Sequence, residues 1–426
     1  MRILTADGQM DAASSRDAIA VLARGLPDPE LFERLLRHEE AFSGEPLVAG
    51  NDIELLVDGP ETYAAMLEAI AAAEHHIHLE TYILDDDEVG RQLADALIER
   101  RGAGVDVKLI YDAFGAIDCC GDYFERLREA GVELVEFHPV NPVEDVRVWR
   151  VNERDHRKLL IIDGRVGFTG GINFSSTYSS SSAARPGEDR GLDTGWRDTH
   201  VRIQGPAVAQ LQRLFLTVWH RHSDAERDRV AESRFFPEPR EAGDTYVRML
   251  SSRGSDDEPS DIYRAYLNAI EQAQDRVWIT QAYFAPNDRL IDALGDAAGR
   301  QVDVRIVVPG FTDLWLIFYA SRARYADLLE TGVRLYEMPG ALLHAKTAVV
   351  DGVWSTVGSS NLDTRSRLHN LEANAVMLGH SFGARMEAQF EEDVAETRKI
   401  TADEWRERSI WERIKEWIAT RFDYWL

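Results

Sequence analysis

Two stretches of the sequence, HRKLLIIDGRVGFTGGIN (156–173) and HAKTAVVDGVWSTVGSSN (344–361), follow the same pattern. Each begins His-x-Lys, continues with an apolar run that reaches Asp-Gly, and ends with a second apolar run followed by small residues and Asn. Asp-Gly between two apolar runs is a strong two-residue turn signal, so each stretch is predicted to form a β-hairpin. Because side chains alternate along a strand, the His and Lys of each hairpin are predicted to share one face.

The similarity between the two stretches extends far outward along the chain. ETYAAMLEAIAAAEHHIHLETYIL (61–84) and DIYRAYLNAIEQAQDRVWITQAYF (261–284) both predict a helix followed by a strand. A second helix with a short apolar strand follows in each copy (90–115 and 289–310), and a third helix ends at a glycine before the hairpin. This repeated alternation predicts an α/β fold built from two tandem domains.

The repeat divides the chain into five parts. A polar, proline-containing stretch after the first copy is predicted to be the linker. TYSSSSAARPGEDRGLDTG (177–195) predicts a surface loop, either a mobile segment beside the site or a disordered insertion. The predicted parts are an N-terminal helical extension (1–47), a first domain (48–224), a linker (225–245), a second domain (246–400) and a C-terminal amphipathic helix (401–426).

Composition narrows the class of protein. A chain of 426 residues with 44% hydrophobic residues has enough material for two folded domains. A net charge of -26 would repel a polyanion, which argues against nucleic acid as the substrate. The only cysteines, Cys119 and Cys120, are adjacent and lack metal-ligand spacing, which fits a reducing compartment. No run of about 18 apolar residues predicts a membrane-spanning helix.

The two His-x-Lys pairs match the needs of phosphodiester chemistry. A phosphodiester resists attack because it is anionic and has a poor leaving group, so its catalyst needs a nucleophile, an acid and positive charge. His156 and His344 can act as nucleophile and acid, and Lys158 and Lys346 can stabilise the charge on phosphorus oxygens. One such motif arises by chance in some chains, but two at equivalent repeat positions are far rarer. Lysine is scarce here, and two of the five lysines stand in these motifs.

Further residues near the hairpins are candidates for supporting roles. Asp198, in GWRDTH, and Glu372, in HNLEAN, are candidates to bond the imidazoles and fix their tautomers, although a surface or N-cap role fits them equally well. Asp163 and Asp351 occupy the turns, on the face opposite the histidines, so a structural role is predicted for both. The candidates for direct phosphate contact are Lys158, Lys346, Gly171, Asn173, Ser359 and Asn361.

The paired HxKx4D segments, followed by GGxN and GSxN, resemble the phospholipase D superfamily. LETYILDDDEVG, YDAFG, GWRDTHVRIQGPAV and NLEAN look like the blocks of bacterial cardiolipin synthases. The resemblance implies two α/β/α sandwich domains related by a pseudo-twofold axis, with the site between them. It also implies transfer of a phosphatidyl group between phospholipids, with no metal or other cofactor. A phosphohistidine would form on His156 with His344 as the acid, or in the reverse assignment.

The resemblance has one departure and several consequences for partners. Many cardiolipin synthases begin with two transmembrane helices, whereas this chain looks like the subgroup without them. Phospholipids, with phosphatidylglycerol foremost, are the expected partners, and the expected location is the inner face of a bacterial cytoplasmic membrane as a peripheral protein. The sequence does not indicate an oligomeric state.

The C-terminal residues offer a means of membrane contact. WRERSIWERIKEWIATRFDYWL (405–426) predicts one helix with an apolar stripe, which suits either a lipid interface or the protein's own core. The stripe contains Trp411, Ile414, Ile418, Phe422 and Trp425, with Trp405, Trp417 and Tyr424 nearby.

Other functions compete with the leading hypothesis of a phosphatidyltransferase that makes cardiolipin. A phospholipase D-type hydrolase would use the same residues with water as acceptor, because the acceptor depends on how the site excludes water. A nuclease is disfavoured by the acidic composition and by the lack of a basic stripe. A non-catalytic lipid-binding module would have no reason to keep both His-Lys pairs.

Overall fold

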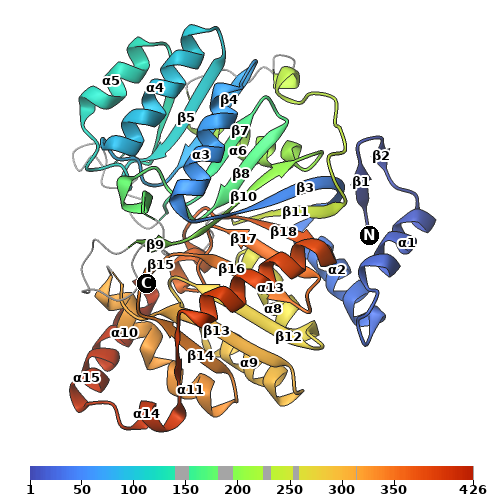
Figure 1. The fold of residues 1–426 in the computed structure, drawn as a ribbon, viewed down its shortest axis with the longest axis vertical. Coiled ribbons are helices and arrows are strands. Elements are labelled where there is room, and N and C mark those ends of the chain that lie inside the picture. Colours follow the sequence, from blue (N-terminus) through green and yellow to red (C-terminus); the bar gives the residue numbers. More distant parts are fainter. Residues whose placement is uncertain (140–152, 181–194, 224–231, 253–258, 313, 426) are drawn as a thin grey trace.

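The two halves of the chain repeat one topology in the computed structural model (Figure 1). The structure describes residues 1–139, 153–180, 195–223, 232–252, 259–312 and 314–425, with side chains up to residue 422. Most of the predicted surface loop (181–194) and, with residue 224, the first part of the predicted linker (225–231) lie outside the described residues.

Each half contains a mixed sheet with the same strand order. Three parallel strands stand at one side, and antiparallel strands that include the predicted hairpin complete the sheet. In the first half the order is β6 (Glu133–Phe137), β5 (Asp106–Asp112), β4 (His76–Thr81), β7 (Leu159–Ile162), β8 (Val166–Gly170), β10 (Thr199–Gln204) and β3 (Leu47–Val57). In the second half it is β14 (Arg334–Met338), β13 (Asp303–Pro309), β12 (Arg276–Gln281), β16 (Lys346–Val350), β17 (Trp354–Gly358), β18 (Ala373–Leu378) and β11 (Thr245–Ser251).

The two sheets join through equivalent strands. β3 and β11 pair antiparallel, with Thr245 opposite Asn51 and Val247 opposite Val48. Because β3 and β11 occupy the same place in the two repeats, this pairing relates the halves by a pseudo-twofold axis. The predicted duplication is therefore confirmed, and the sheets of the two copies form one continuous sheet.

Helices cover both faces of each sheet (Figure 1). Phe215 and Phe390, from one helix of each half, belong to a single apolar cluster that also contains strand residues of both halves. The α/β/α layering is confirmed, and the two inner helices share one core. The outer helices are α3 (Asp58–Ala71), α4 (Glu88–Gly102) and α5 (Gly121–Glu129) in the first half and α8 (Asp261–Gln272), α9 (Asp288–Gly299) and α11 (Tyr325–Glu330) in the second, and the inner ones are α6 (Val208–His222) and α13 (His380–Ala395).

The N-terminal extension contains α1 (Ala12–Leu22) and α2 (Pro29–Ser43) and packs on the second half. Glu39 of α2 is fully buried, and its carboxylate accepts hydrogen bonds from Arg248 Nη1 at 2.7 Å and Trp354 Nε1 at 2.8 Å. A buried carboxylate needs such partners, so these bonds tie the extension into the second half's core.

The motif aspartates shape the hairpin turns. Asp163 and Asp351 have φ of 55° and 53°, and the glycine after each has φ of 64°, the left-handed pair that a two-residue hairpin turn requires. The Asp163 carboxylate also accepts backbone N–H bonds from Glu74, His75 and His76, and Asp351 accepts the equivalent bonds from residues 274–276. Asp163 therefore ties its turn to the start of β4, and Asp351 ties its turn to the start of β12.

The motif histidines stand just outside the strands. β7 begins at Leu159 and β16 at Lys346, so the prediction that each His lies within a hairpin strand is wrong. The segments that carry His156 and His344 pair instead with the opposite half of the molecule, as described below.

The prediction of one C-terminal helix over 401–426 is also wrong. The segment forms α14 (Ala402–Arg406), α15 (Ile410–Ala419) and the 3-10 helix η4 (Thr420–Trp425). Thr401 starts α14 and Ser409 starts α15, each through a capping box, so the box at Ser409 interrupts the predicted helix after Trp405. Trp405 is buried, whereas Trp411 and Trp417 are exposed. Within the described residues, no helix combines the length and apolarity needed to cross a membrane.

Candidate active site between the halves

Each motif segment forms backbone hydrogen bonds with the other half. The N–H of His156 donates to the carbonyl of Leu371 at 2.9 Å, and the N–H of His344 donates to the carbonyl of Arg197 at 2.8 Å. The strands β9 (Trp196–Arg197) and β15 (Leu342–Leu343) pair in parallel beside the second of these bonds. The two histidines therefore sit where the halves meet.

A carboxylate from the opposite half bonds each imidazole. His156 Nδ1 lies 3.0 Å from Glu372 Oε2, and His344 Nδ1 lies 2.7 Å from Asp198 Oδ2. A carboxylate at Nδ1 favours the tautomer with the proton there and leaves Nε2 for chemistry. The sequence left the pairing of carboxylate and histidine open, and the structure places it across the interface in both cases.

Both carboxylates are held in place by further donors. Glu372 accepts from the hydroxyls of Ser359 and Ser366, the latter at 2.8 Å, and from the Asn370 amide at 3.3 Å. Although burial acts to raise it, the pKa of Glu372 is lowered, chiefly by the charge of His156. Ser366 and Asn370 were not predicted from the sequence, where the only signal is that Asn370 begins NLEAN and Ser366 lies shortly before it.

Asp198 is held in a similar way on the other side. Its second oxygen accepts the backbone N–H of Thr199 at 2.7 Å. Burial opposes ionisation here too, but the charge of His344 and the hydrogen bond from it lower the pKa of Asp198. Both orienting carboxylates are therefore charged near neutral pH.

The two lysines concentrate positive charge beside the histidines. Both are buried; Lys158 Nζ donates to the carbonyl of His156 at 2.6 Å, and Lys346 Nζ donates to that of His344. Burial lowers the pKa of Lys158 to about 7 and that of His156 to about 4, the latter against the attraction of Glu372. Burial, followed by the charge of Lys346, also lowers the pKa of His344. Such a site favours an anion, because a negative charge would stabilise every protonated group around it.

Aromatic rings enclose the imidazoles. The ring of Tyr82 lies 5.0 Å from that of His156, and the rings of Trp196, Tyr178 and Tyr283 lie 5.3, 5.7 and 6.1 Å from that of His344. Apolar walls around a charged centre lower the local dielectric and strengthen its electrostatic interactions.

Anion binding is expected to weaken as pH rises above about 7. Below that pH Lys158 is charged before an anion arrives, whereas above it the lysine must take up a proton on binding. The affinity for sulfate, which stays dianionic throughout, should fall by up to about tenfold per pH unit between pH 7.5 and 9. Calorimetry in buffers of different ionisation enthalpy measures the proton uptake. A Lys158→Met variant should show a weaker pH dependence, because only proton uptake at His344 remains, and a pH-independent affinity in the unmodified protein would contradict the assignment.

Comparison with known proteins identifies the family. The family model "Cardiolipin synthase, PLD-like domain" matches residues 66–183 and 266–394, one match in each half. The chain belongs to this cardiolipin synthase family of phospholipase D-like proteins.

Curated members of the cardiolipin synthase family resemble the chain over most of its length. The cardiolipin synthase of Alkalihalophilus pseudofirmus is 35% identical over 384 residues, which cover 90% of this chain and 74% of that protein. The major cardiolipin synthase of Bacillus subtilis is 34% identical over 374 residues, which cover 87% of this chain and 74% of that protein. Among solved structures, phosphatidylserine synthase from Haemophilus influenzae matches 91% of this chain and 97% of its own, with a TM-score of 0.68. At 15% identity, that match shows a shared fold alone.

In this cardiolipin synthase family member, two residues predicted to contact phosphate form hydrogen bonds within the protein. Asn173 accepts the N–H of Ile83 at 3.1 Å and donates to the Tyr178 hydroxyl at 2.9 Å, so both ends of its amide are engaged. The Ser359 hydroxyl donates to Glu372. Their polar groups are already bonded within the protein, and these bonds hold the walls of the site in place.

Gly171 and Asn361 differ from those two. A Cβ on Gly171 would collide with the Asp198 carboxylate, so this glycine makes room for the orienting acid. Asn361 Oδ1 is buried and has no hydrogen-bond partner among the described residues, and its backbone N–H donates to Ser366 Oγ. Of the amides proposed for substrate contact, only that of Asn361 keeps a free acceptor in the described part of the chain.

A buried charge cluster supports His156 and has no counterpart in the second half. Arg157 Nη2 lies 2.6 Å from Glu80 Oε1, and its Nε lies 3.2 Å from Asp155 Oδ1, with all three side chains buried. The repeat places Thr280, Leu343 and Ala345 at the positions of Glu80, Asp155 and Arg157.

Replacing Arg157 with alanine is expected to destabilise the fold by about 3–5 kcal/mol, because it leaves the Asp155 carboxylate and the carboxyl group of Glu80 buried without their cationic partner. A Glu80→Thr/Asp155→Leu/Arg157→Ala variant carries the second half's residues and should recover most of the loss. Urea unfolding followed by circular dichroism measures both. Equal midpoints for the single variant and the unmodified protein would show that the cluster contributes nothing.

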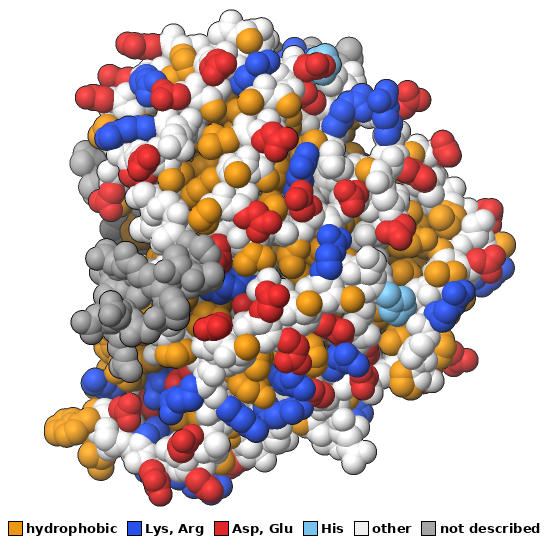
Figure 2. Space-filling model, in the orientation of Figure 1, with side chains coloured by type: hydrophobic (Ala, Val, Ile, Leu, Met, Phe, Trp, Pro, Cys, Tyr) orange, Lys and Arg blue, Asp and Glu red, His pale blue; other side chains and the backbone are white. Residues whose placement is uncertain are grey.

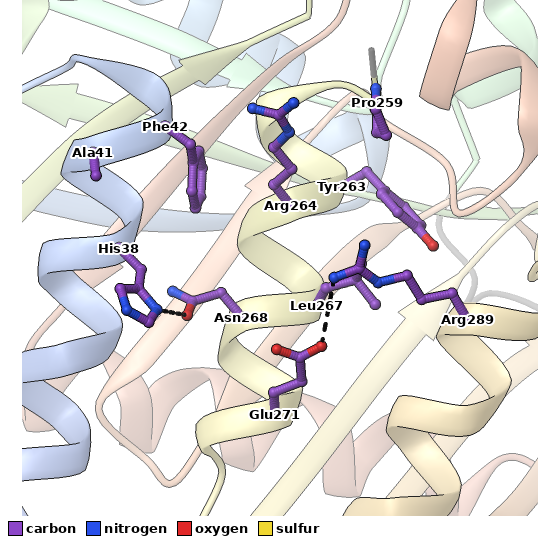
Figure 3. Close-up of a pocket in the computed structure, with 10 residues that line it drawn as sticks. All are labelled: His38, Ala41, Phe42, Pro259, Tyr263, Arg264, Leu267, Asn268, Glu271 and Arg289. Carbon is purple, nitrogen blue, oxygen red and sulfur yellow. Dashed lines mark hydrogen bonds and ion pairs between the residues drawn. The ribbon is translucent and has the colours of Figure 1, made fainter.

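One cavity is separate from these motifs. It has a volume of about 640 Å³ and lies between α2, α8 and α9, lined by residues such as His38, Phe42, Tyr263 and Arg289 (Figure 3). Its two clearest polar contacts, His38 to Asn268 and Arg289 to Glu271, are internal (Figure 3). None of the motif residues lines it, so this cavity is not part of the candidate site.

Proposed function

We propose that the protein is a phosphatidyltransferase that joins two phospholipids, with phosphatidylglycerol as donor, and releases glycerol. The observation that carries this proposal is the pair of His-Lys motifs in which each histidine is oriented by a carboxylate from the other half. Family membership supports the substrate class, since the similar curated proteins are named cardiolipin synthases.

In the first step, His156 Nε2 attacks the phosphorus of the donor. The N–P bond forms as the bond from phosphorus to the glycerol oxygen breaks, and His344 Nε2 gives its proton to that oxygen. Throughout this step, the Glu372 carboxylate accepts a hydrogen bond from Nδ1–H of His156, which stabilises the positive charge that develops on the imidazole. The ammonium groups of Lys158 and Lys346 stabilise the non-bridging phosphate oxygens.

In the second step, neutral His344 takes a proton from the hydroxyl of the acceptor headgroup. The acceptor oxygen forms a bond to phosphorus while the N–P bond to His156 breaks. His344 must be protonated at the start of the first step. The bound anionic phosphate supplies the negative charge that keeps it so, because this charge offsets the lowering of the His344 pKa by burial and by Lys346.

Transfer in place of hydrolysis requires that water be kept from the phosphohistidine. The rings of Tyr82, Tyr178, Trp196 and Tyr283 around the imidazoles serve this purpose. The phospholipids would be taken from the inner face of a bacterial membrane, with the protein attached peripherally through the exposed face of α15.

Incubation with phosphatidylglycerol vesicles tests the proposed reaction. Thin-layer chromatography of the lipids and enzymatic assay of glycerol should show cardiolipin and glycerol in equal amounts. A His156→Ala/His344→Ala variant is the matched control and should form neither. Phosphatidic acid as the sole lipid product would identify a hydrolase and refute the transferase.

A further inference from the structure

Nearly all large hydrophobic side chains exposed on the described surface belong to three segments. Val21 of α1 is the exception. The first segment follows β5 and exposes Phe114 and Ile117, the second follows β13 and exposes Leu314 and Trp315, and the third is α15 with the start of η4. The exposed residues of the third segment are Ile410, Trp411, Ile414, Trp417, Ile418 and Phe422.

The first two segments are equivalent in the repeat. β5 and β13 hold the same place in the two sheets, and the exposed apolar residues follow the carboxyl end of each. Tyr82 follows β4 and Tyr283 follows β12, and these tyrosines lie against His156 and His344. Since β4 is parallel to β5 and β12 to β13, the apolar loops lie at the same sheet edges as the site.

Packing contacts, some of them through an intermediate element, connect all three segments to the site. Arg154 stands two residues before His156, and its guanidinium lies 5.8 Å from the Phe114 ring centroid. The helix α10 (Trp315–Ala323) lines a small cavity through Ile317 together with Tyr283. The third segment reaches the site through η4, which packs against α12 (Thr364–Leu368), whose Ser366 donates to Glu372.

The third segment presents its apolar side outward. α15 packs against α10, and Figure 2 shows hydrophobic side chains projecting from the lower left of the molecule, where Figure 1 places these two helices. Its carboxylates are paired with arginines: Glu416 with Arg408 at 2.9 Å and Glu412 with Arg322 at 3.7 Å. The exposed side chains of this segment are therefore apolar, aromatic or basic, since Arg413, Lys415 and Arg421 are exposed beside the hydrophobic residues, and this composition suits the interface between lipid headgroups and acyl chains.

We infer that these three segments form one bilayer-docking surface, in which the two equivalent loops insert on either side of the site and α15 lies flat on the membrane. This inference rests on the proposed function for its choice of a phospholipid bilayer as the partner. The surface would turn the opening between the halves toward the lipids, so that a headgroup reaches the histidines without leaving the membrane. A protein of net charge -26 is repelled by an anionic membrane, so apolar contacts must supply the attraction.

Three double variants and one control test the surface: Phe114→Ser/Ile117→Ser, Leu314→Ser/Trp315→Ser, Trp411→Ser/Trp417→Ser, and Val21→Ser. Val21 is 53% exposed, comparable to Trp315 at 57%, but lies outside the surface. Co-sedimentation with vesicles of phosphatidylglycerol and phosphatidylcholine should show at least about tenfold weaker binding for each double variant and no change for Val21→Ser. Binding of the unmodified protein should hold or rise between 0.1 and 0.5 M NaCl, because salt screens the repulsion.

The outcomes separate the docking surface from the proposed reaction. Vesicle turnover should fall with binding in the double variants, while turnover of monomeric dihexanoyl phosphatidylglycerol stays within about twofold. Double variants that bind vesicles like the unmodified protein would overturn the surface even if cardiolipin is made. Unmodified protein that binds vesicles through these residues but forms no lipid product would refute the reaction and leave the surface standing. If sedimentation velocity shows a dimer that only the double variants lose, while vesicle binding is unchanged, the surface joins two copies and the inference is wrong.

Discussion

A His156→Ala variant is expected to lose phosphatidyl transfer by about 10⁴- to 10⁶-fold, because the covalent route begins at its Nε2. A His344→Ala variant is expected to lose about 10²- to 10⁴-fold with phosphatidylglycerol, since it removes the acid and base but not the nucleophile. Neither loss of activity is expected to come from unfolding, because each histidine lies at the interface between the halves and not within their apolar cores.

A p-nitrophenyl ester of phosphatidic acid separates the two roles. Its leaving group departs without a proton, so His344→Ala should still release one equivalent of p-nitrophenol in a burst and accumulate a phosphatidyl group on His156, detectable by intact mass. His156→Ala should show neither, and His75→Ala, which removes an exposed histidine away from the site, should behave as the unmodified protein. A burst in His156→Ala alone would reverse the assignment, and bursts in both variants would argue against a covalent histidine.

Glu372→Gln and Asp198→Asn are each expected to lower kcat by about 10² to 10⁴-fold with a small change in KM. The amides keep the shape of the carboxylates but remove the charge that stabilises the imidazolium and the acceptor that fixes its tautomer. Glu372 and Asp198 bond Nδ1 at 3.0 and 2.7 Å, so the loss acts directly on the reacting ring.

The pH dependence distinguishes this positioning role from a structural one. Loss of the carboxylate lowers the pKa of the paired histidine. In Glu372→Gln the acidic limb of the rate profile, set by protonation of the nucleophile His156, should move to lower pH, whereas in Asp198→Asn the alkaline limb, set by deprotonation of the acid His344, should move to lower pH. Glu387→Gln is the matched control, because its carboxylate pairs with Arg276 at 3.0 Å away from the site. A fall in kcat with an unmoved pH profile, together with a lower unfolding midpoint, would indicate that the carboxylates act only on stability.

Much of the architecture could be read from local sequence patterns. The helix-strand repeat, the two hairpins and their Asp-Gly turns depend on residue spacing and turn chemistry within a few positions, and the structure contains all of them. The structural role predicted for Asp163 and Asp351 agrees with their bonds to the starts of β4 and β12. The C-terminal segment failed as a single helix because the capping box at Ser409 starts a new helix after Trp405, and because the α-helix ends at Ala419 and is followed by 3-10 turns.

By itself, the sequence determined that the protein is a duplicated α/β chain with one His-Lys pair in each copy. Only the tertiary structure decided which carboxylate serves which histidine: Glu372 is 216 residues from His156, and Asp198 is 146 residues from His344. It also decided that Ser359 and Asn173 hold the site in place and that three distant apolar segments gather beside it. Periodicity and turn signals act between neighbours along the chain, whereas these arrangements depend on the pairing of β3 with β11, which brings the two halves face to face.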